Sequence, residues 1–124
     1  MVGYYYIAAT VLLTVYGQLI LKWRMLDVGA LPDGAAEKIL FLVRLVLDPY
    51  IFSGLAAAFI AAIFWMAAMS KFDISYAYPF TSLSFVLVLI LAALFFGEPL
   101  NLHKIIGIVL IVLGLIVSSS GGKI

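Results

Sequence analysis

Four long stretches of this chain carry no charged residue, and they limit the possible folds more than any other feature. They cover residues 1–21, 49–70, 74–97 and 105–122, so each has between 18 and 24 residues. An α-helix rises about 1.5 Å per residue and needs about 20 apolar residues to cross a hydrocarbon core about 30 Å thick. Each stretch is therefore long enough to cross a membrane as one helix.

The composition supports the same interpretation. Of the 124 residues, 67% are hydrophobic and 10% are charged, whereas a soluble domain has about 45–50% and about 25%. A soluble fold of this size could not bury so much apolar surface. Residues 85–96 show none of the alternation of a membrane β-strand. The sequence predicts one all-α integral membrane domain over residues 1–124, with spans at about 2–21, 50–70, 75–96 and 105–121.

The connection between the first two spans is the only long one, and it contains a segment of mixed character at residues 35–48. Glu37, Arg44 and Asp48 recur there at intervals of seven and four, which places them on one helical face. At this length and charge the segment is too short to span, and it suits an amphipathic helix at the membrane interface. The alternative is that it lengthens the second span, because Pro49 also fits the first turn of a helix.

Basic residues indicate an orientation. The first and third connections hold five of them, and the opposite side holds two: Lys22, Arg24, Lys38, Arg44 and Lys104 against Lys71 and Lys123. By the positive-inside rule, the first and third connections are cytoplasmic and both termini lie outside. The same cationic cluster could bind a lipid phosphate, although basic residues often serve only as a topology signal.

Polar residues inside spans are the first candidates for function, because they are costly in lipid. In the first span Thr10, Thr14, Gln18 and Lys22 follow one another at intervals of four, so they form a slowly turning stripe. The stripe either packs against another helix or lines a substrate path. The third span concentrates its polarity at its start, where Tyr78, Pro79 and Ser82 lie, and Tyr78 could also be an interfacial tyrosine. Trp65 of the second span either lines a cavity or is a large side chain that only packs between helices.

Other residues point to packing or exclude classes of chemistry. Gly54, Ala58 and Ala62 form a small-residue face that predicts close helix contact, and Gly107 with Gly114 suggests a similar contact or a dimer interface. The absence of cysteine excludes thiolate chemistry, and a net charge of +1 gives no reason to expect a nucleic-acid partner. No metal or other cofactor is expected. All six carboxylates lie outside the uncharged stretches, which argues against proton-coupled export of cations.

Several short motifs resemble a known family. They are Gly17-Gln18 with Lys22, Ser75-Tyr-Ala-Tyr-Pro79 with Ser82-Leu-Ser-Phe-Val86, and Gly97-Glu98-Pro99 followed by Gly107 and Gly114. The chain resembles four-helix members of the drug/metabolite transporter superfamily, related to small multidrug resistance and EamA-like proteins. It is most similar to subunits that flip aminoarabinose-phosphoundecaprenol. The multidrug branch carries a glutamate in its first helix, where this chain has Thr14.

The resemblance implies a non-enzymatic flippase, or flippase subunit, for a polyprenyl-phosphate glycolipid in a bacterial inner membrane. The phosphate would meet Lys22 or Arg24, and the sugar would meet Gln18, Tyr78 and Ser82. Four short helices can hardly enclose a substrate, so we expect a homodimer or a heterodimer with a homologous four-helix subunit. Two alternatives stay open: an exporter of small molecules or drugs, and an accessory subunit of a membrane glycosyltransferase.

Overall fold

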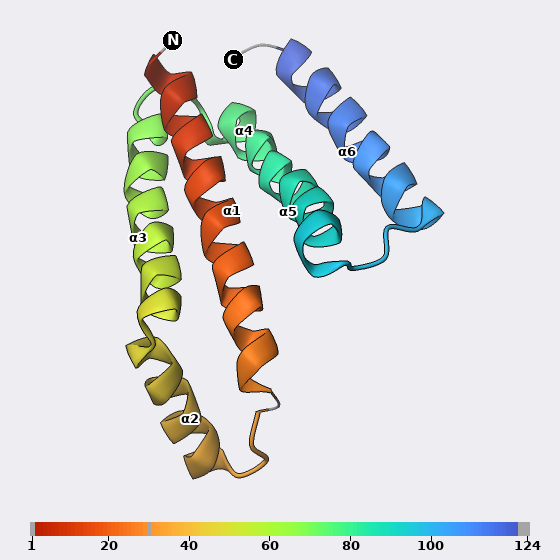
Figure 1. Ribbon diagram of the computed structural model, residues 1–124. Coiled ribbons are helices and arrows are strands. Elements are labelled where there is room, and N and C mark those ends of the chain that lie inside the picture. Colours follow the sequence, from red (N-terminus) through yellow and green to blue (C-terminus); the bar gives the residue numbers. More distant parts are fainter. Residues whose placement is uncertain (1, 30, 122–124) are drawn as a thin grey trace.

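The computed structural model describes residues 2–29 and 31–121, and the regular elements in these ranges are all helical (Figure 1). Four apolar helical segments are long enough to cross a membrane: Val2–Val28, Pro49–Met69, Ile74–Phe96 and Leu102–Ser120. This confirms the prediction of an all-helical fold with four candidate spans. The elements are α1 (Val2–Val28), α2 (Ala35–Leu47), α3 (Pro49–Met69), α4 (Ile74–Ala77), the 3-10 turn η1 (Tyr78–Thr81), α5 (Ser82–Phe96) and α6 (Leu102–Ser120). Lys123, which enters the orientation argument, lies outside the described residues.

Helix α1 continues well past the end of its uncharged stretch. It runs through Lys22 and Arg24 to Val28, because no glycine or proline interrupts that segment. The helix ends at Gly29, which has a φ of 89° and donates its backbone N–H to the carbonyl of Met25 at 3.2 Å. A left-handed residue at this position favours glycine, which has no Cβ to clash. The charged end of α1 is therefore a rigid extension of the first span.

Helices α1 and α3 form the most closely packed pair. A Cβ placed on Gly17 would lie 3.0 Å from the carbonyl oxygen of Gly54, so the two backbones nearly touch. Around this contact Val11 and Val15 of α1 and Ala57 of α3 are buried. The absence of side chains at the two glycines thus permits the close approach.

The predicted small-residue face of α3 is only partly correct. Gly54 packs against α1 as expected, but Ala58 and Ala62 are exposed, and Ala57 and Ala61 are buried instead. Residues at a strict interval of four drift around a helix by about 40° per step, since a residue advances about 100°. The contact stripe therefore leaves the series after Gly54, and two small side chains are left facing away from the contact.

The third span contains a tightened turn near its start. Tyr78–Thr81 form a 3-10 turn between α4 and α5, with Pro79 near its beginning. Nearby hydroxyls bond to carbonyls one turn back: Thr81 Oγ1 donates to Tyr78 O and Ser82 Oγ donates to Pro79 O, both at 2.6 Å. Pro79 therefore lies near the start of the third span, in the turn directly after the four-residue helix α4.

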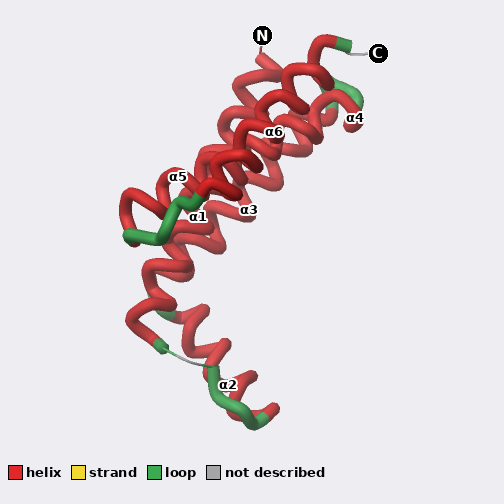
Figure 2. Tube along the Cα trace, turned by 90° about the vertical axis from the view of Figure 1, so that its right-hand side faces the viewer, coloured by secondary structure: helices red, strands yellow, loops and turns green. Residues whose placement is uncertain are grey.

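Helix α2 is separate from α3. The helical conformation is interrupted at Asp48, which has an extended backbone. Its carboxylate accepts hydrogen bonds from the backbone N–H groups of Tyr50 at 2.9 Å and Ile51 at 3.3 Å. None of the α2 residues is buried, and both views show the helix extending beyond the ends of the others (Figures 1 and 2). Four of its exposed apolar residues lie on the side opposite Glu37 and Arg44: Ile39, Leu42, Val43 and Val46. Leu40 and Leu47 are exposed as well. The location of α2 at a membrane interface stays a prediction.

Helix α6 is the least embedded element. It lies next to α5 at the edge of the molecule, and none of its residues is buried (Figure 1). Asn101 begins the helix, because its side-chain oxygen accepts the backbone N–H of Lys104 at 2.9 Å. The core of the molecule consequently lies among α1, α3 and the start of the third span, where Ile7, Val11, Ala68, Phe72, Tyr76 and Ala77 cluster.

Candidate substrate groove

A groove runs along α1 between α3 and the third span. It consists of three adjoining hollows of about 320, 620 and 240 Å³, all of which include Gln18 in their lining. The first two also share Thr14 and Thr81. The polar stripe predicted for the first span thus faces this groove over part of its length. We refer to the three hollows together as the groove.

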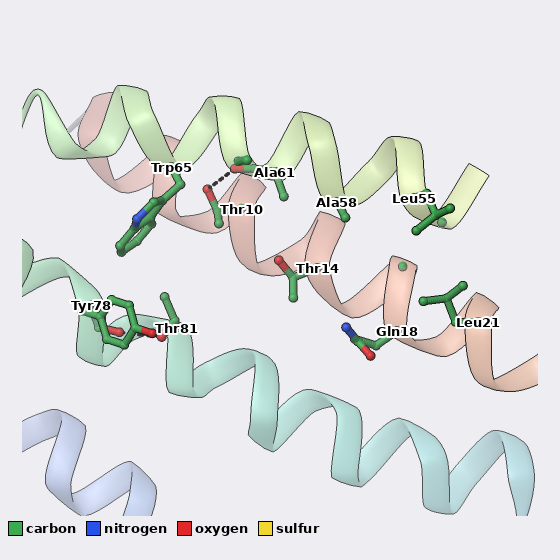
Figure 3. A pocket seen from close by; sticks show the side chains of 13 residues that line it. Thr10, Thr14, Gln18, Leu21, Leu55, Ala58, Ala61, Trp65, Tyr78 and Thr81 are labelled. Atoms are coloured by element: carbon green, nitrogen blue, oxygen red, sulfur yellow. Dashed lines mark hydrogen bonds between the residues drawn. The ribbon is translucent and has the colours of Figure 1, made fainter. Parts of the chain in front are cut away.

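One end of the groove, here called the aromatic end, is formed by Trp65 and Tyr78. Their rings meet edge to face with centroids 5.9 Å apart, and Figure 3 shows both rings beside Thr81 and Thr10. Trp65 is half-buried, whereas Tyr78 is 60% exposed. The aromatic end thus combines apolar ring surface with the polar groups of the two side chains, the Tyr78 hydroxyl and the Trp65 indole N–H.

The middle of the groove offers uncharged hydrogen-bonding groups. Thr14 and Gln18 project from α1 toward the third span (Figure 3). Within the described part of the chain, neither side chain is hydrogen-bonded to another protein group. Opposite them lie the hydroxyls of Thr81, Ser82 and Ser84. Because Ala58 and Ala62 also line the wall, their small side chains leave the space open.

The other end of the groove, here called the ionic end, holds the charges. Lys22 Nζ lies 3.8 Å from Glu98 Oε2, and both residues line the third hollow with Gln18. Glu98 reaches Lys22 because α5 ends at Gly97, whose φ of 66° turns the chain back. A residue with a Cβ would be strained in this left-handed conformation. The Gly97-Glu98 sequence therefore supplies both the turn and the charge.

Arg24 lies outside the groove and has other partners. Its Nη2 donates to Asp48 at 2.7 Å and its Nη1 to Asp27 at 3.3 Å, while the guanidinium lies 5.5 and 5.2 Å from the ring centroids of Trp23 and Tyr50. The hydrogen bond from Arg24, with further ones from the α3 backbone, holds the pKa of Asp48 below its ordinary value. Arg24 thus ties the end of α1 to the start of α3.

Most residues predicted for the site come together, but not all. Thr14, Gln18, Lys22, Trp65, Tyr78 and Ser82 line the groove, whereas Arg24 and Pro79 are absent from its lining. Thr10 also borders the first hollow, yet its hydroxyl bonds to Tyr6 O at 2.8 Å and Ala61 O at 3.4 Å. Thr10 therefore contacts α3, as a packing role requires, while Thr14 and Gln18 line the groove; a substrate path along them stays a prediction.

Three polar residues that line the groove were not predicted from the sequence as site candidates: Thr81, Ser84 and Glu98. The two hydroxyl residues lie in the polar start of the third span, so a wider reading of that cluster would have included them. Glu98 belongs to the Gly97-Glu98-Pro99 motif, but its position beside Lys22 depends on the fold. Among the described residues, no group of His, Cys, Asp and Glu could hold a metal ion.

The chain is similar to known proteins over nearly its whole length. Residues 1–120 match the model of the EamA-like transporter family. A probable 4-amino-4-deoxy-L-arabinose-phosphoundecaprenol flippase subunit ArnF from Aeromonas salmonicida is 32% identical, over 90% of this chain and 75% of the relative. The protein of the same description from Proteus mirabilis is 34% identical, over 90% and 87%. An uncharacterized protein, y4nH, from Sinorhizobium fredii is 33% identical, over 86% and 85%.

No solved structure matches the chain. The family match nevertheless covers all four apolar helices, and two relatives above 30% identity align with most of their own length. On this basis, the chain is a four-span membrane protein that belongs to the EamA-like transporter family.

Proposed function

We propose that the chain is a flippase subunit that moves a polyprenyl-phosphate-linked sugar across a bacterial inner membrane. The names of two relatives describe a flippase subunit for a lipid of this kind. The observation that carries the proposal is the groove beside α1. It offers, in order, the rings of Trp65 and Tyr78, uncharged hydrogen-bonding groups, and Lys22 paired with Glu98. The headgroup passes along the groove while the polyprenyl tail stays in lipid. In this role the chain is a carrier and not an enzyme.

Each predicted site residue receives a part in this proposal. Lys22 binds the phosphate as a point charge. Thr14, Gln18 and Ser82 bond to sugar hydroxyls, and Trp65 with Tyr78 contacts the sugar ring. Pro79 acts indirectly, because it lies in the 3-10 turn that presents Tyr78. We assign Arg24 to the fold, since Asp48 and Asp27 already occupy its guanidinium.

The distribution of charged residues along the groove favours this substrate over an organic cation. The residues that line its two larger hollows are all uncharged. An exporter that exchanges protons for cations needs an acid on the path, to hold the cation and to titrate. The carboxylate of Glu98 lies at the ionic end and is paired with Lys22. A lipid phosphate attached to a sugar matches this distribution better, because its phosphate has Lys22 as a partner and its sugar has the uncharged groups.

A second four-helix subunit, either a copy or a homologue, completes the proposed carrier. The groove is open along one side, and the nearby surfaces of α5 and α6 are apolar and largely exposed; they include Phe85, Ile90, Leu94, Ile105, Val109 and Leu113. Such a surface can face lipid or a partner helix. Site-directed crosslinking through Gly107 and Gly114, combined with charge-reversal reporters, distinguishes a homodimer from a heterodimer and shows the orientation of each subunit.

Helix α2 is proposed to lie at the cytoplasmic membrane surface. Its exposed apolar face and its Glu37–Arg44 face suit the boundary between acyl chains and water. Because the backbone is extended at Asp48, the axis of α2 need not follow the axis of α3. Fluorophores attached at positions 39 and 44 should be quenched by lipid probes to different extents. Equal quenching at the two positions would contradict an interfacial location.

The function is tested by transport in liposomes. The chain, alone and with its partner, is reconstituted with labelled polyprenyl-phosphate sugar, and transbilayer movement is measured for the wild type, Gln18→Ala, Lys22→Ala and Tyr78→Phe. Loss of a hydrogen bond to a charged group costs about 1.5–3 kcal/mol, so Lys22→Ala should slow transport roughly tenfold to a hundredfold. Tyr78→Phe should have a smaller effect of about two- to tenfold.

Lys104→Ala is the matched control for Lys22→Ala. It removes a lysine at the same end of the molecule, but Lys104 lies outside the groove and donates to Pro99 O at 2.9 Å. Its transport rate should stay close to that of the wild type. Unchanged transport in all three groove variants would refute the site, and no transport by the wild type with its partner would refute the function.

A further inference from the structure

The cationic side chains near the ionic end of the groove are already paired or hydrogen-bonded within the protein. Arg24 is held by Asp48 and Asp27, and Lys104 Nζ donates to the backbone of Pro99. Lys22 and Glu98 have each other, with their side chains 51% and 40% exposed. A headgroup arriving at this end therefore meets a cation and a carboxylate together, and not a cation alone.

The position of Glu98 is set by the backbone. Gly97 ends α5 in the left-handed region, and the N–H of Glu98 points back to the carbonyl of Ala92 at 3.5 Å. This fixes the direction in which the chain leaves the helix. Glu98 is consequently held beside Lys22 by the end of α5 and does not depend on the course of a long loop.

A phosphate that binds Lys22 must come close to Glu98. The lysine nitrogen and the carboxylate oxygen are 3.8 Å apart. Two like charges about 4 Å apart in water repel enough to change an equilibrium constant about fivefold, and the effect grows near a protein or a membrane. A headgroup with only negative charge displaces Glu98 and is then repelled by it. A headgroup that also carries an amine can replace both members of the ion pair.

We propose that Glu98 is a specificity-determining residue that admits phosphate headgroups bearing an amine and rejects headgroups that are only anionic. The inference rests on the proposed function, since it assigns selectivity to the same groove. Its consequence is that acidic phospholipids and unmodified polyprenyl phosphate, although they carry the phosphate that Lys22 would bind, are excluded by the neighbouring carboxylate.

The test compares two lipids that differ in one charge. Transbilayer movement of a polyprenyl-phosphate amino sugar and of its N-acetyl form is measured in liposomes, with the partner subunit present. The wild type should prefer the amine form at least about fivefold. Glu98→Gln should bring this preference close to one, mainly by faster movement of the N-acetyl form. Lys22→Gln should slow both lipids, and Glu98→Asp should keep the preference.

Glu37→Gln is the matched control, because it removes the same charge from an exposed position on α2. It should retain the wild-type preference, and unfolding temperatures verify that every variant is folded. Equal movement of both lipids by the wild type, or an unchanged preference in Glu98→Gln, would overturn the inference and leave the proposed function intact. If the wild type with its partner moves neither lipid, the proposed function fails and the inference fails with it.

Discussion

The α1–α3 pair and helix α6 differ in how closely each packs against the rest of the molecule. Helices α1 and α3 meet through backbone contact at Gly17 and Gly54, and their shared face contains most of the buried residues. Helix α6 has no buried residue, and a Cβ added at Gly107 or Gly114 would meet nothing within 4 Å. The same residue type therefore has opposite meanings. A glycine in the first pair permits an existing contact, whereas a glycine in α6 leaves room for a contact that one chain does not make.

The largest predicted effect on stability is the difference between a substitution at Gly17, in the α1–α3 pair, and one at Gly114, in α6. Gly17→Val should lower the free energy of unfolding by about 1–3 kcal/mol, because its side chain would enter the contact with the Gly54 backbone. Gly114→Val is the control, since both positions are helical and pay a similar helix-propensity cost. Reversible unfolding in detergent micelles that keep the chain monomeric measures both. Equal losses in the two variants would show that α6 packs as tightly as α1.

A smaller effect is expected at the end of the molecule where the termini lie. Tyr4 and Tyr76 join α1 to α4 through a hydrogen bond of 2.7 Å between their hydroxyls. Tyr76→Phe should cost about 0.5–1.5 kcal/mol in the same unfolding measurement. The control is Ser120→Ala in α6, whose hydroxyl bonds within its own helix, to Val117 O. If Ser120→Ala destabilised the protein as much as Tyr76→Phe, the contrast between the helices around the core and α6 would be weakened.

The link between Arg24 and Asp48 should make the α1–α3 pair sensitive to pH. Because folding lowers the pKa of Asp48, its stabilising effect is fully present above the ordinary aspartate pKa of about 3.9. The effect is lost as the pH falls through the lower pKa of the folded state. Asp48→Asn should therefore lower the unfolding temperature at pH 7 and differ less from the wild type near pH 3. A constant difference across this range would exclude the ionised carboxylate as the cause.

The smallest effect on stability is expected at the ionic end. Lys22 and Glu98 are both substantially exposed, and pairs of this kind contribute about 1 kcal/mol or less. Lys22→Gln should therefore unfold almost like the wild type although it transports more slowly. A large loss of stability in Lys22→Gln would show that the pair mainly fastens α1 to the segment after α5.

Charge segregation was sufficient to predict the four helices, since a charged residue is excluded from most of a span. Intervals of four also brought Thr14, Gln18 and Lys22 to one face. Glu98 could not be found in this way, because its place beside Lys22 depends on the left-handed turn at Gly97. The partners of Arg24 were hidden for a similar reason: the sequence shows a cation at a helix end, and only the fold brings Asp48 to it.

Helix lengths have a further consequence for the membrane that surrounds the protein. At about 1.5 Å per residue, the 27 residues of α1 extend about 40 Å, whereas the 19 residues of α6 extend about 28 Å. In any one bilayer α1 must tilt or protrude while α6 fits the hydrocarbon thickness. A bilayer with longer acyl chains draws Lys22 and Glu98 toward the hydrocarbon. Acyl-chain length should therefore change how readily the ion pair opens, and transport measured in bilayers of different thickness would check this without any substitution in the chain.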